Sequence, residues 1–440
     1  MNHPLRLALG LILLSWFQLG LAQSSEMSME QAIDYALTNS PEIQDALLKV
    51  QDAEAQILQS KSTGLPQLSA SGQYQRYFKV PLVPLPPEFT GPDGPQEVSF
   101  VQKNNLTGSV NLDAMIFDAA YFVALKAARS ARSYAQLELV NSQREVRKQV
   151  RDVYLPVLLL QSNLEQLDKN IESLTTLQQE TAEIYKAGFA EQLDVDRLSL
   201  SLANLQTERE SLDRQYQNAI RALRFTINYP EGQDLSISDD LDGLLAEFDG
   251  EILTAKVDYN RRPEVRLLDQ AVILNDYNIQ NFKTQYLPSL RGFGGYQYQY
   301  QGNDFTNGFW APTGFVGLSL NIPLYDGGFK RSQIQRAQIS RDQVMVQKTT
   351  VQRLIDLEVE NARASYTSAN ERLDAREKNL ELAQRIYDTT QIKYREGVGS
   401  SLEVNQAEQD LYTAQTNRLQ ALYELLQARI DLEEALGWEQ

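Results

Sequence analysis

The sequence lacks cysteine and has a single histidine, His3, close to its N-terminus. The rest of the chain therefore excludes thiol chemistry, a Ser-His-Asp triad, and zinc, haem or copper held by imidazole. Basic residues are also scarce, because 41 Lys and Arg stand against 58 Asp and Glu for a net charge of −17. That balance argues against nucleic acid as a partner, which needs a basic face. We expect no catalytic residues, no metal site and no cofactor.

Long apolar runs are missing too. After residue 22 no stretch reaches the roughly 18 apolar residues of a membrane-spanning helix. The N-terminus carries one charge, Arg6, then an apolar run from Leu7 to Leu14, and small residues end this segment at Ala22. This pattern is typical of a secretory signal peptide, residues 1–22, although an uncleaved anchor is the alternative. We expect the chain to be exported by a cleavable signal peptide.

The chain contains two related copies of one pattern. Leu65-Pro66-Gln67-Leu68 resembles Leu287-Pro288-Ser289-Leu290, and Tyr185-Lys186-Ala187-Gly188 resembles Tyr394-Arg395-Glu396-Gly397. Further matching blocks occur in the same order, which predicts a tandem structural repeat. Copy one also has a proline-rich insertion, Lys79 to Glu97, which we predict to be an exposed loop without strand or helix. The predicted units are repeat 1 at 23–230, an acidic connector at 231–250 and repeat 2 at 251–440.

Each copy has the same predicted order: a helix, two strands, a long helix and a returning helix. Apolar and polar residues alternate in the strands, so that one face is apolar and aromatic while the other is rich in Gln, Asn and Ser. The alternation suits the wall of a transmembrane barrel, but an ordinary half-buried antiparallel sheet gives the same pattern. The predicted strands are about 67–78, 98–117, 288–300 and 309–325. The predicted helices are about 28–62, 119–186, 192–228, 262–285, 328–395 and 402–436.

The long helices show the period of coiled coils. Apolar residues of the first one recur at steps of four and three from Val146 to Leu174, and Gly188 and Gly397 end the two long helices. Pro156 lies inside the first, where we expect a local kink. Strands embedded in lipid must close into a barrel, and four per chain are too few. The chain is therefore predicted to oligomerise, and a trimer would supply twelve strands.

Together these features resemble the TolC-type outer membrane efflux proteins, also called outer membrane factors. The resemblance covers nearly all of the chain after the signal peptide. It rests on the repeat, on Leu287-Pro288-Ser289-Leu290 opening a strand, on the segment Leu318–Gly328 leading into a long helix, and on the turns that end at Gly188 and Gly397.

The resemblance implies a mixed, mainly α fold. Its long helices would form a coiled-coil α-helical barrel in the periplasm. Its four strands per chain would belong to a homotrimeric, 12-stranded transmembrane β-barrel in outer membrane lipid. The implied function is a passive exit duct of a tripartite efflux or type I secretion system. A periplasmic adaptor protein and an inner-membrane transporter would open its periplasmic tip.

The resemblance also implies which residues form the gate. Aligning the turn glycines places Glu403 at one gate carboxylate, while Gln406 stands where a second acidic residue is often found. Asp194 falls on an acidic position that in the family can bond a tyrosine, here Tyr394, and Gly399 replaces a basic residue that helps some members stay closed. The alternative interpretation is that these carboxylates are ordinary caps at helix N-termini. The turn residues implied to dock the adaptor are Gly188, Glu191, Gly397, Gly399 and Ser400.

Two other classes of function remain open. A soluble periplasmic coiled-coil scaffold or adaptor would explain the long helices but not the four amphipathic strands. A carboxylate-based enzyme is disfavoured, because the acidic residues are spread along helix faces rather than gathered on short loops.

Overall fold

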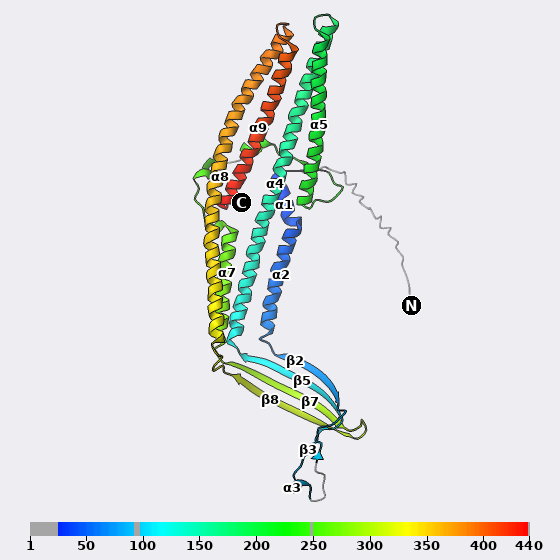
Figure 1. Cartoon of the computed structure of the whole chain (residues 1–440), viewed down its shortest axis with the longest axis vertical. Helices are drawn as coiled ribbons and strands as arrows, with labels where there is room; N and C mark the ends of the chain where they lie inside the picture. The colour runs from blue at the N-terminus through cyan, green and yellow to red at the C-terminus, as the bar shows by residue number, and fades with distance from the viewer. Residues whose placement is uncertain (1–24, 92–96, 247–249, 439–440) are drawn as a thin grey trace, which may run out of the picture.

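The structure is a computed structural model that describes residues 25–91, 97–246 and 250–438 of the 440-residue chain. The predicted signal peptide, residues 1–22, lies outside the described residues. Figure 1 shows an elongated molecule with long helices along its main axis, a β-sheet at one end and two helical turns at the other.

The helices at the start of the chain differ from the prediction of one helix over 28–62. The structure has α1 (Met29–Asn39) and α2 (Pro41–Ser62), with Ser40 between them in an extended conformation. A proline disfavours helical backbone at the residue before it, so Pro41 ends the first helix at this point. The Ser40 side chain then caps α2 by accepting a hydrogen bond from the Ile43 amide.

Two long helical hairpins form the body of the molecule. The first is α4 (Ala119–Lys186) with α5 (Gln192–Thr226), and the second is α8 (Phe329–Arg395) with α9 (Ser401–Leu436). Helix α7 (Pro263–Thr284) packs against both α4 and α8, and α2 packs against α4. Helix α4 continues through Pro156, whose missing N–H removes one backbone hydrogen bond. Across the described ranges, none of the helices is both long and apolar enough to cross a bilayer.

One antiparallel sheet joins the two copies. Its strand order is β2 (Gln67–Arg76), β5 (Asn104–Phe117), β7 (Ser289–Gly302) and β8 (Gly308–Asn321), so the central pair takes one strand from each copy. The register aligns Leu68, Leu112, Gly294 and Val316 on one face. Apolar side chains on that face are exposed, with Val316 at 91%. The face needs a lipid or protein covering to leave water.

The proline-rich insertion has regular structure, so the prediction of a bare loop was wrong. Strand β3 (Val83–Pro84) pairs antiparallel with β4 (Glu97–Val98), and the short helix α3 (Pro87–Thr90) lies between them. A two-residue ladder tolerates Pro84 because a proline can lie on an edge where its missing N–H is not needed.

The acidic connector contributes to the core. Strand β6 (Leu235–Ile237) pairs in parallel with β1 (Ser25–Met27), and α6 (Leu241–Ala246) follows. Leu235, Ile237 and Leu241 are buried in the cluster formed by α1, α4, α5 and α9. Two short 3₁₀ helices, η1 (Gly250–Thr254) and η2 (Tyr259–Arg261), then lead into α7.

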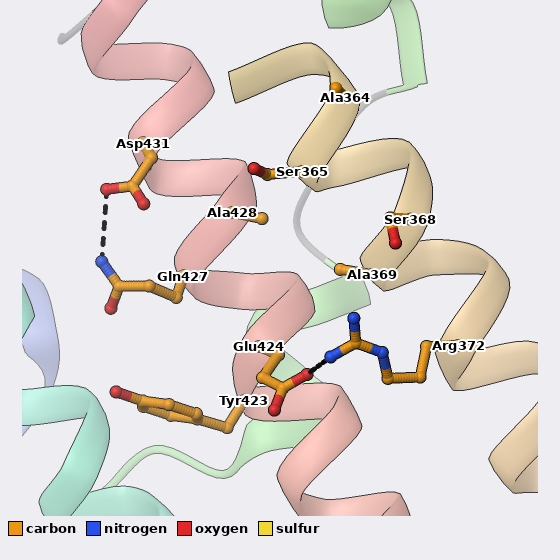
Figure 2. A pocket seen from close by; sticks show the side chains of 10 residues that line it. All are labelled: Ala364, Ser365, Ser368, Ala369, Arg372, Tyr423, Glu424, Gln427, Ala428 and Asp431. Carbon is orange, nitrogen blue, oxygen red and sulfur yellow. Dashed lines mark hydrogen bonds and ion pairs between the residues drawn. The ribbon is translucent and has the colours of Figure 1, made fainter. Parts of the chain in front are cut away.

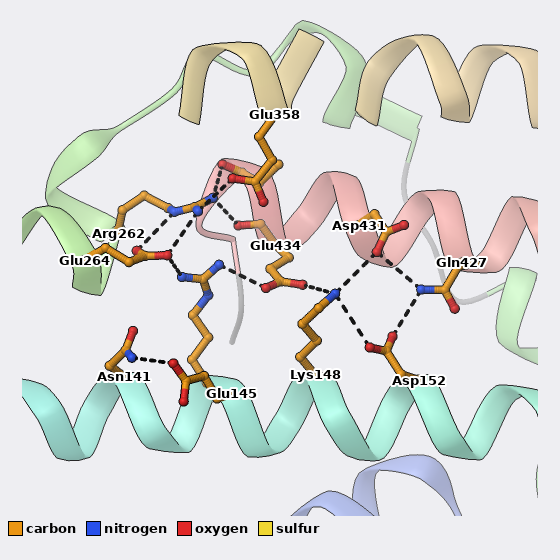
Figure 3. Close-up of polar contacts among 12 residues, drawn as sticks. Asn141, Glu145, Lys148, Asp152, Arg262, Glu264, Glu358, Gln427, Asp431 and Glu434 are labelled. Atoms are coloured by element: carbon orange, nitrogen blue, oxygen red, sulfur yellow. Dashed lines mark hydrogen bonds and ion pairs between the residues drawn. The ribbon is translucent and has the colours of Figure 1, made fainter. Parts of the chain in front are cut away.

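A network of ion pairs holds α4, α7, α8 and α9 together near the middle of the molecule (Figure 3). The Glu434 carboxylate of α9 accepts from Arg144 at 3.0 Å and from Lys148 at 2.9 Å, both on α4. Arg262, which is 3% exposed, pairs with Glu264 at 3.1 Å and with Glu358 at 2.9 Å. Because Arg144, Arg262 and Glu434 are largely buried, each of these three charges needs its partners.

Candidate functional site at the helical tip

The two hairpin turns lie at the end of the molecule farthest from the sheet (Figure 1). Both long helices end in the same way. Gly188 and Gly397 adopt left-handed backbone conformations with φ of +83° and +74°. The amide after each glycine donates back into the helix, Phe189 to the Ile184 carbonyl and Val398 to the Lys393 carbonyl, both at 3.0 Å. This is the Schellman ending that favours glycine.

The returning helices both begin with a carboxylate on the first turn. The Glu403 amide donates to the Ser400 hydroxyl at 3.3 Å, and the Ser400 amide donates to the Glu403 carboxylate at 3.4 Å. In the other turn the Glu191 amide donates to Asp194 Oδ2 at 3.2 Å. Both carboxylates therefore cap helix N-termini within one chain, which is the geometry of the alternative interpretation.

The predicted direct bond between Asp194 and Tyr394 is not among the hydrogen bonds of the described residues. The Tyr394 hydroxyl instead donates to Thr181 Oγ1 at 3.3 Å, and Asp194 Oδ1 accepts from Ser401. The Glu191 amide and the Ser401 hydroxyl donate to the two Asp194 oxygens instead. Burial raises the pKa of Tyr394, and the nearby Asp194 charge raises it further.

Asp194 and Tyr394 thus both contact the other hairpin, but their partners Ser401 and Thr181 were not predicted, and further contacts come from residues that the sequence prediction missed. Ser401 also accepts from Arg197 Nη1 at 3.3 Å, and the Ser201 hydroxyl donates to Asn405, so α5 and α9 are joined at two levels. Arg395 Nε of α8 donates to Glu180 of α4 at 3.0 Å. Their positions in the sequence carry no signal of these pairs, because the partners lie about one repeat apart.

The remaining predicted gate residues lie on the surface of α9. Glu403 and Gln406 are exposed in the single chain and are three residues apart, so they share one side of the helix. Gln406 Nε2 donates to Asp410 at 3.0 Å. Gly399 packs closely on the end of α8, because a Cβ there would lie 3.0 Å from the Tyr394 nitrogen and 3.2 Å from Lys393. Any side chain at this position therefore requires the end of α8 to give way by a few tenths of an ångström.

Glu408 is a further carboxylic acid near the tip that the sequence prediction did not single out. It is 9% exposed, and its Oε2 is buried without a hydrogen-bond partner among the described residues. Burial raises the pKa of Glu408 to about 7. Its spacing was a usable signal, since it lies four residues after the buried Val404 and seven after the buried Ser401.

An open groove runs between α8 and α9 nearer the middle of the hairpin (Figure 2). Arg372 of α8 pairs with Glu424 of α9 across it, and Gln427 donates to Asp431 at 3.3 Å along α9. Its floor is made of small side chains that include Ala369 and Ala428. The groove is open and its lining mixes polar and apolar side chains, so it does not enclose a small ligand.

Comparison with known proteins relates most of the chain to one family. The family model for outer membrane efflux protein matches residues 32–228 and 259–438. Outer membrane protein TolC of Escherichia coli K12 is 24% identical over 467 residues, covering 99% of this chain and 87% of that protein. The pyoverdine export outer membrane protein OpmQ of Pseudomonas aeruginosa PAO1 is 22% identical, covering 93% and 85%. The CmeC outer membrane channel of Campylobacter jejuni shares the fold, with a TM-score of 0.70, 18% identity and coverage of 93% and 85%.

Proposed function

The chain belongs to the outer membrane efflux protein family, and we propose that it is the outer membrane exit duct of a tripartite efflux or type I secretion system. The matched segments cover the helices and strands of both repeats. TolC and OpmQ are outer membrane proteins by their names, and OpmQ exports pyoverdine. In this proposal the protein is a passive channel rather than an enzyme, and the energy for export comes from an inner-membrane transporter.

The observation that carries the proposal is the two-sided sheet at the end of two long hairpins. Its exposed apolar face includes Leu68, Val316 and Leu318, and its other face carries polar residues such as Ser69, Asn111 and Ser319. Strands β2 and β8 leave open edges, which a bilayer does not tolerate. Three chains would supply twelve strands and close the wall, with lipid outside and water inside.

The helices provide the second half of the duct. Helix α4 has 68 residues, which at 1.5 Å per residue is about 100 Å. In a homotrimer anchored in outer membrane lipid, such hairpins would extend through the periplasm and meet at their tips. Three copies of Glu403 would place a ring of carboxylates at the mouth, which favours cations. Gln406 would add polar, uncharged side chains one turn further in.

The tip is the proposed gate. The bonds from Ser401 to Asp194 and from Tyr394 to Thr181 join the hairpin α8–α9 to α4–α5, and so favour the closed arrangement. We infer that a periplasmic adaptor docks on the turn residues and shifts this balance. The docking set remains Gly188, Glu191, Gly397, Gly399 and Ser400, all at the exposed or half-exposed surface of the turns.

Membrane fractionation with reconstitution tests the proposal. An exit duct stays with the outer membrane until detergent is added, runs as a trimer, and conducts ions across a planar bilayer. A soluble periplasmic scaffold or adaptor, the alternative function, would be released by osmotic shock and would not conduct. Release of the protein with the periplasmic fraction would reject the duct.

A further inference from the structure

We propose that Glu408 is a protonation switch in the packing between the two hairpins, in which the neutral acid keeps α9 in the seam and the carboxylate favours separation of the tips. This inference rests on the proposed function and names a regulator of its gate. It adds to the tip bonds already described, because Glu408 takes part in none of them.

The position of Glu408 belongs to a packing seam. On α9 the buried residues Ser401, Val404, Glu408 and Leu411 recur at steps of three and four, the period of a coiled-coil seam. Helix α9 packs against α4 and α5 as well as against α8. An acid therefore occupies a position where this seam needs an apolar side chain. The apolar cluster at this level consists of Leu174 and Leu177 of α4, Leu198 of α5, Ala383 and Tyr387 of α8, and Val404, Ala407 and Leu411 of α9.

Among the described residues, no basic side chain compensates the carboxyl group of Glu408. Burial is the cause of the raised pKa of Glu408, with no basic side chain acting against it. Tyr387 of α8 is a titratable group that the Glu408 charge affects. Its pKa is raised chiefly by burial and also by that charge. The Tyr387 hydroxyl is already engaged with Ser173 at 3.2 Å and Gln391 at 3.4 Å. An ionised Glu408 in this seam is therefore destabilised unless water reaches it.

Charged groups of the helices packed against α9 have partners other than Glu408. Arg395 of α8 pairs with Glu180 of α4, and Arg197 of α5 donates to Ser401. Asp388 and Arg395 act with opposite sign on the pKa of Tyr387. None of these groups accounts for the raised pKa of Glu408. Burial alone is its cause.

The other repeat provides an internal comparison. Aligning Gly188 with Gly397 places Ser199 of α5 opposite Glu408. Ser199 is exposed, and its hydroxyl donates to the Val195 carbonyl at 2.7 Å, as a solvent-facing serine does. The buried acid is thus specific to α9, the helix that contacts all three of the others at the tip.

The direction of the effect follows from the two environments. In water a glutamate has its ordinary pKa of 4.5, whereas burial raises the pKa of Glu408 to about 7. Between pH 4.5 and about 7, Glu408 is therefore protonated in the closed seam but ionised in the hydrated, separated tip. Raising the pH through this window therefore favours separation, on the order of tenfold or more per chain between pH 5.5 and 8.5.

The experiment measures the distance between the hairpins directly. Because the chain has no cysteine, spin labels can be attached at Leu200→Cys on α5 and Gln409→Cys on α9, both exposed positions. The trimer is measured in detergent by double electron–electron resonance at pH 5.5 and 8.5. We expect a longer and broader distance distribution at pH 8.5. Glu408→Gln, a neutral isostere, should keep the short distance at both values, while Glu371→Gln, a change at an exposed glutamate of α8, should respond as the unmodified chain does.

Single-channel recording of the same variants separates this inference from the proposed function. A pH-dependent distance without any conductance would leave the switch standing and reject the duct. Conductance with a distance that is the same at both pH values, or a Glu408→Gln chain that responds to pH as the unmodified chain does, would overturn the switch.

Discussion

The hydroxyl of Ser401 on α9 donates a hydrogen bond to the carboxylate of Asp194 on α5, although the two residues lie 207 positions apart. Each residue lies on the first turn of its helix, and Asp194 also accepts from the Glu191 amide. One carboxylate thus caps its own helix and holds the neighbouring hairpin. This pairing joins the first turn of α9 to the first turn of α5.

Ser401→Ala should loosen the tip. The change removes the hydrogen bond to the charged Asp194, a contribution of about 1.5–3 kcal/mol. It also removes the bond that Ser401 accepts from Arg197, and it leaves the bond from the Glu191 amide to Asp194 in place. We expect higher single-channel conductance in planar bilayers, with a smaller increase for Tyr394→Phe, which removes a bond between two neutral hydroxyls. Thr413→Ala, an exposed position further along α9, is the matched control because its hydroxyl donates to the Gln409 carbonyl within its own helix. Unchanged conductance in a chain carrying Asp194→Ala and Tyr394→Phe together would refute the lock.

Gly399→Arg, which introduces the basic residue that the family resemblance places here, should open the tip instead of locking it. Its Cβ would lie 3.0 Å from the Tyr394 nitrogen, so the end of α8 must shift. Val398→Arg adds the same charge at a neighbouring residue that is 78% exposed. We expect a larger rise in conductance for Gly399→Arg than for Val398→Arg. Lower conductance of the Gly399→Arg variant would contradict this prediction. It would show that the added positive charge closes the tip more than the new Cβ contact with α8 opens it.

Glu434→Ala should destabilise the middle of the molecule. Arg144 and Lys148 share this carboxylate, and removing one partner of a buried ion pair costs about 3–5 kcal/mol. The prediction is a lower midpoint of denaturant unfolding. Lys49→Ala breaks an exposed pair with Asp45 and should change stability by less than about 1 kcal/mol. Equal midpoints for the two variants would contradict the network's role.

Acid should weaken the same network. Burial tends to raise the pKa of Glu264, but its own backbone hydrogen bond together with Arg144 and Arg262 lowers it below the ordinary 4.5. A carboxyl group with a lowered pKa stabilises the fold above its unfolded value, and this contribution is lost as the pH falls through its folded value. The free energy of unfolding should therefore drop below about pH 4.5, and Glu264→Gln should drop less steeply. A Glu264→Gln chain with the same acid profile would refute this assignment.

Val316→Arg should impair membrane insertion. Val316 lies on the apolar face of β8, where an arginine facing lipid costs about 2–4 kcal/mol near the bilayer centre. Ser319→Arg places the same charge on the polar face of the same strand and should be tolerated. The measurement is the amount of trimer recovered from the outer membrane fraction. Equal recovery of both variants would mean that the sheet does not have one face against lipid and the other against water.

Much of the helical architecture could be predicted because its signals are local. The heptad spacing from Val146 onward and the glycines at 188 and 397 mark the long helices and their ends, and α4 begins and ends where the sequence predicts. The break at Ser40 was missed, although Pro41 carried its signal. Residues of the connector, such as Leu241, were assigned to a linker because burial depends on helices far away in the chain.

The tip was less predictable. The positions of Asp194 and Glu403 follow from the turn glycines, but their partners depend on how two hairpins pack. For this reason the sequence did not predict that Asp194 accepts from Ser401 while Tyr394 donates to Thr181. The burial of Glu408 likewise depends on α4, α5 and α8 together.

Single-channel recording of the detergent-extracted protein decides whether it is an exit duct. We expect trimers that insert into planar bilayers, conduct with a preference for cations, and conduct more when Ser401 is changed to alanine. Protein recovered from the outer membrane that never conducts, in either the unmodified chain or the Ser401→Ala variant, would contradict the exit duct.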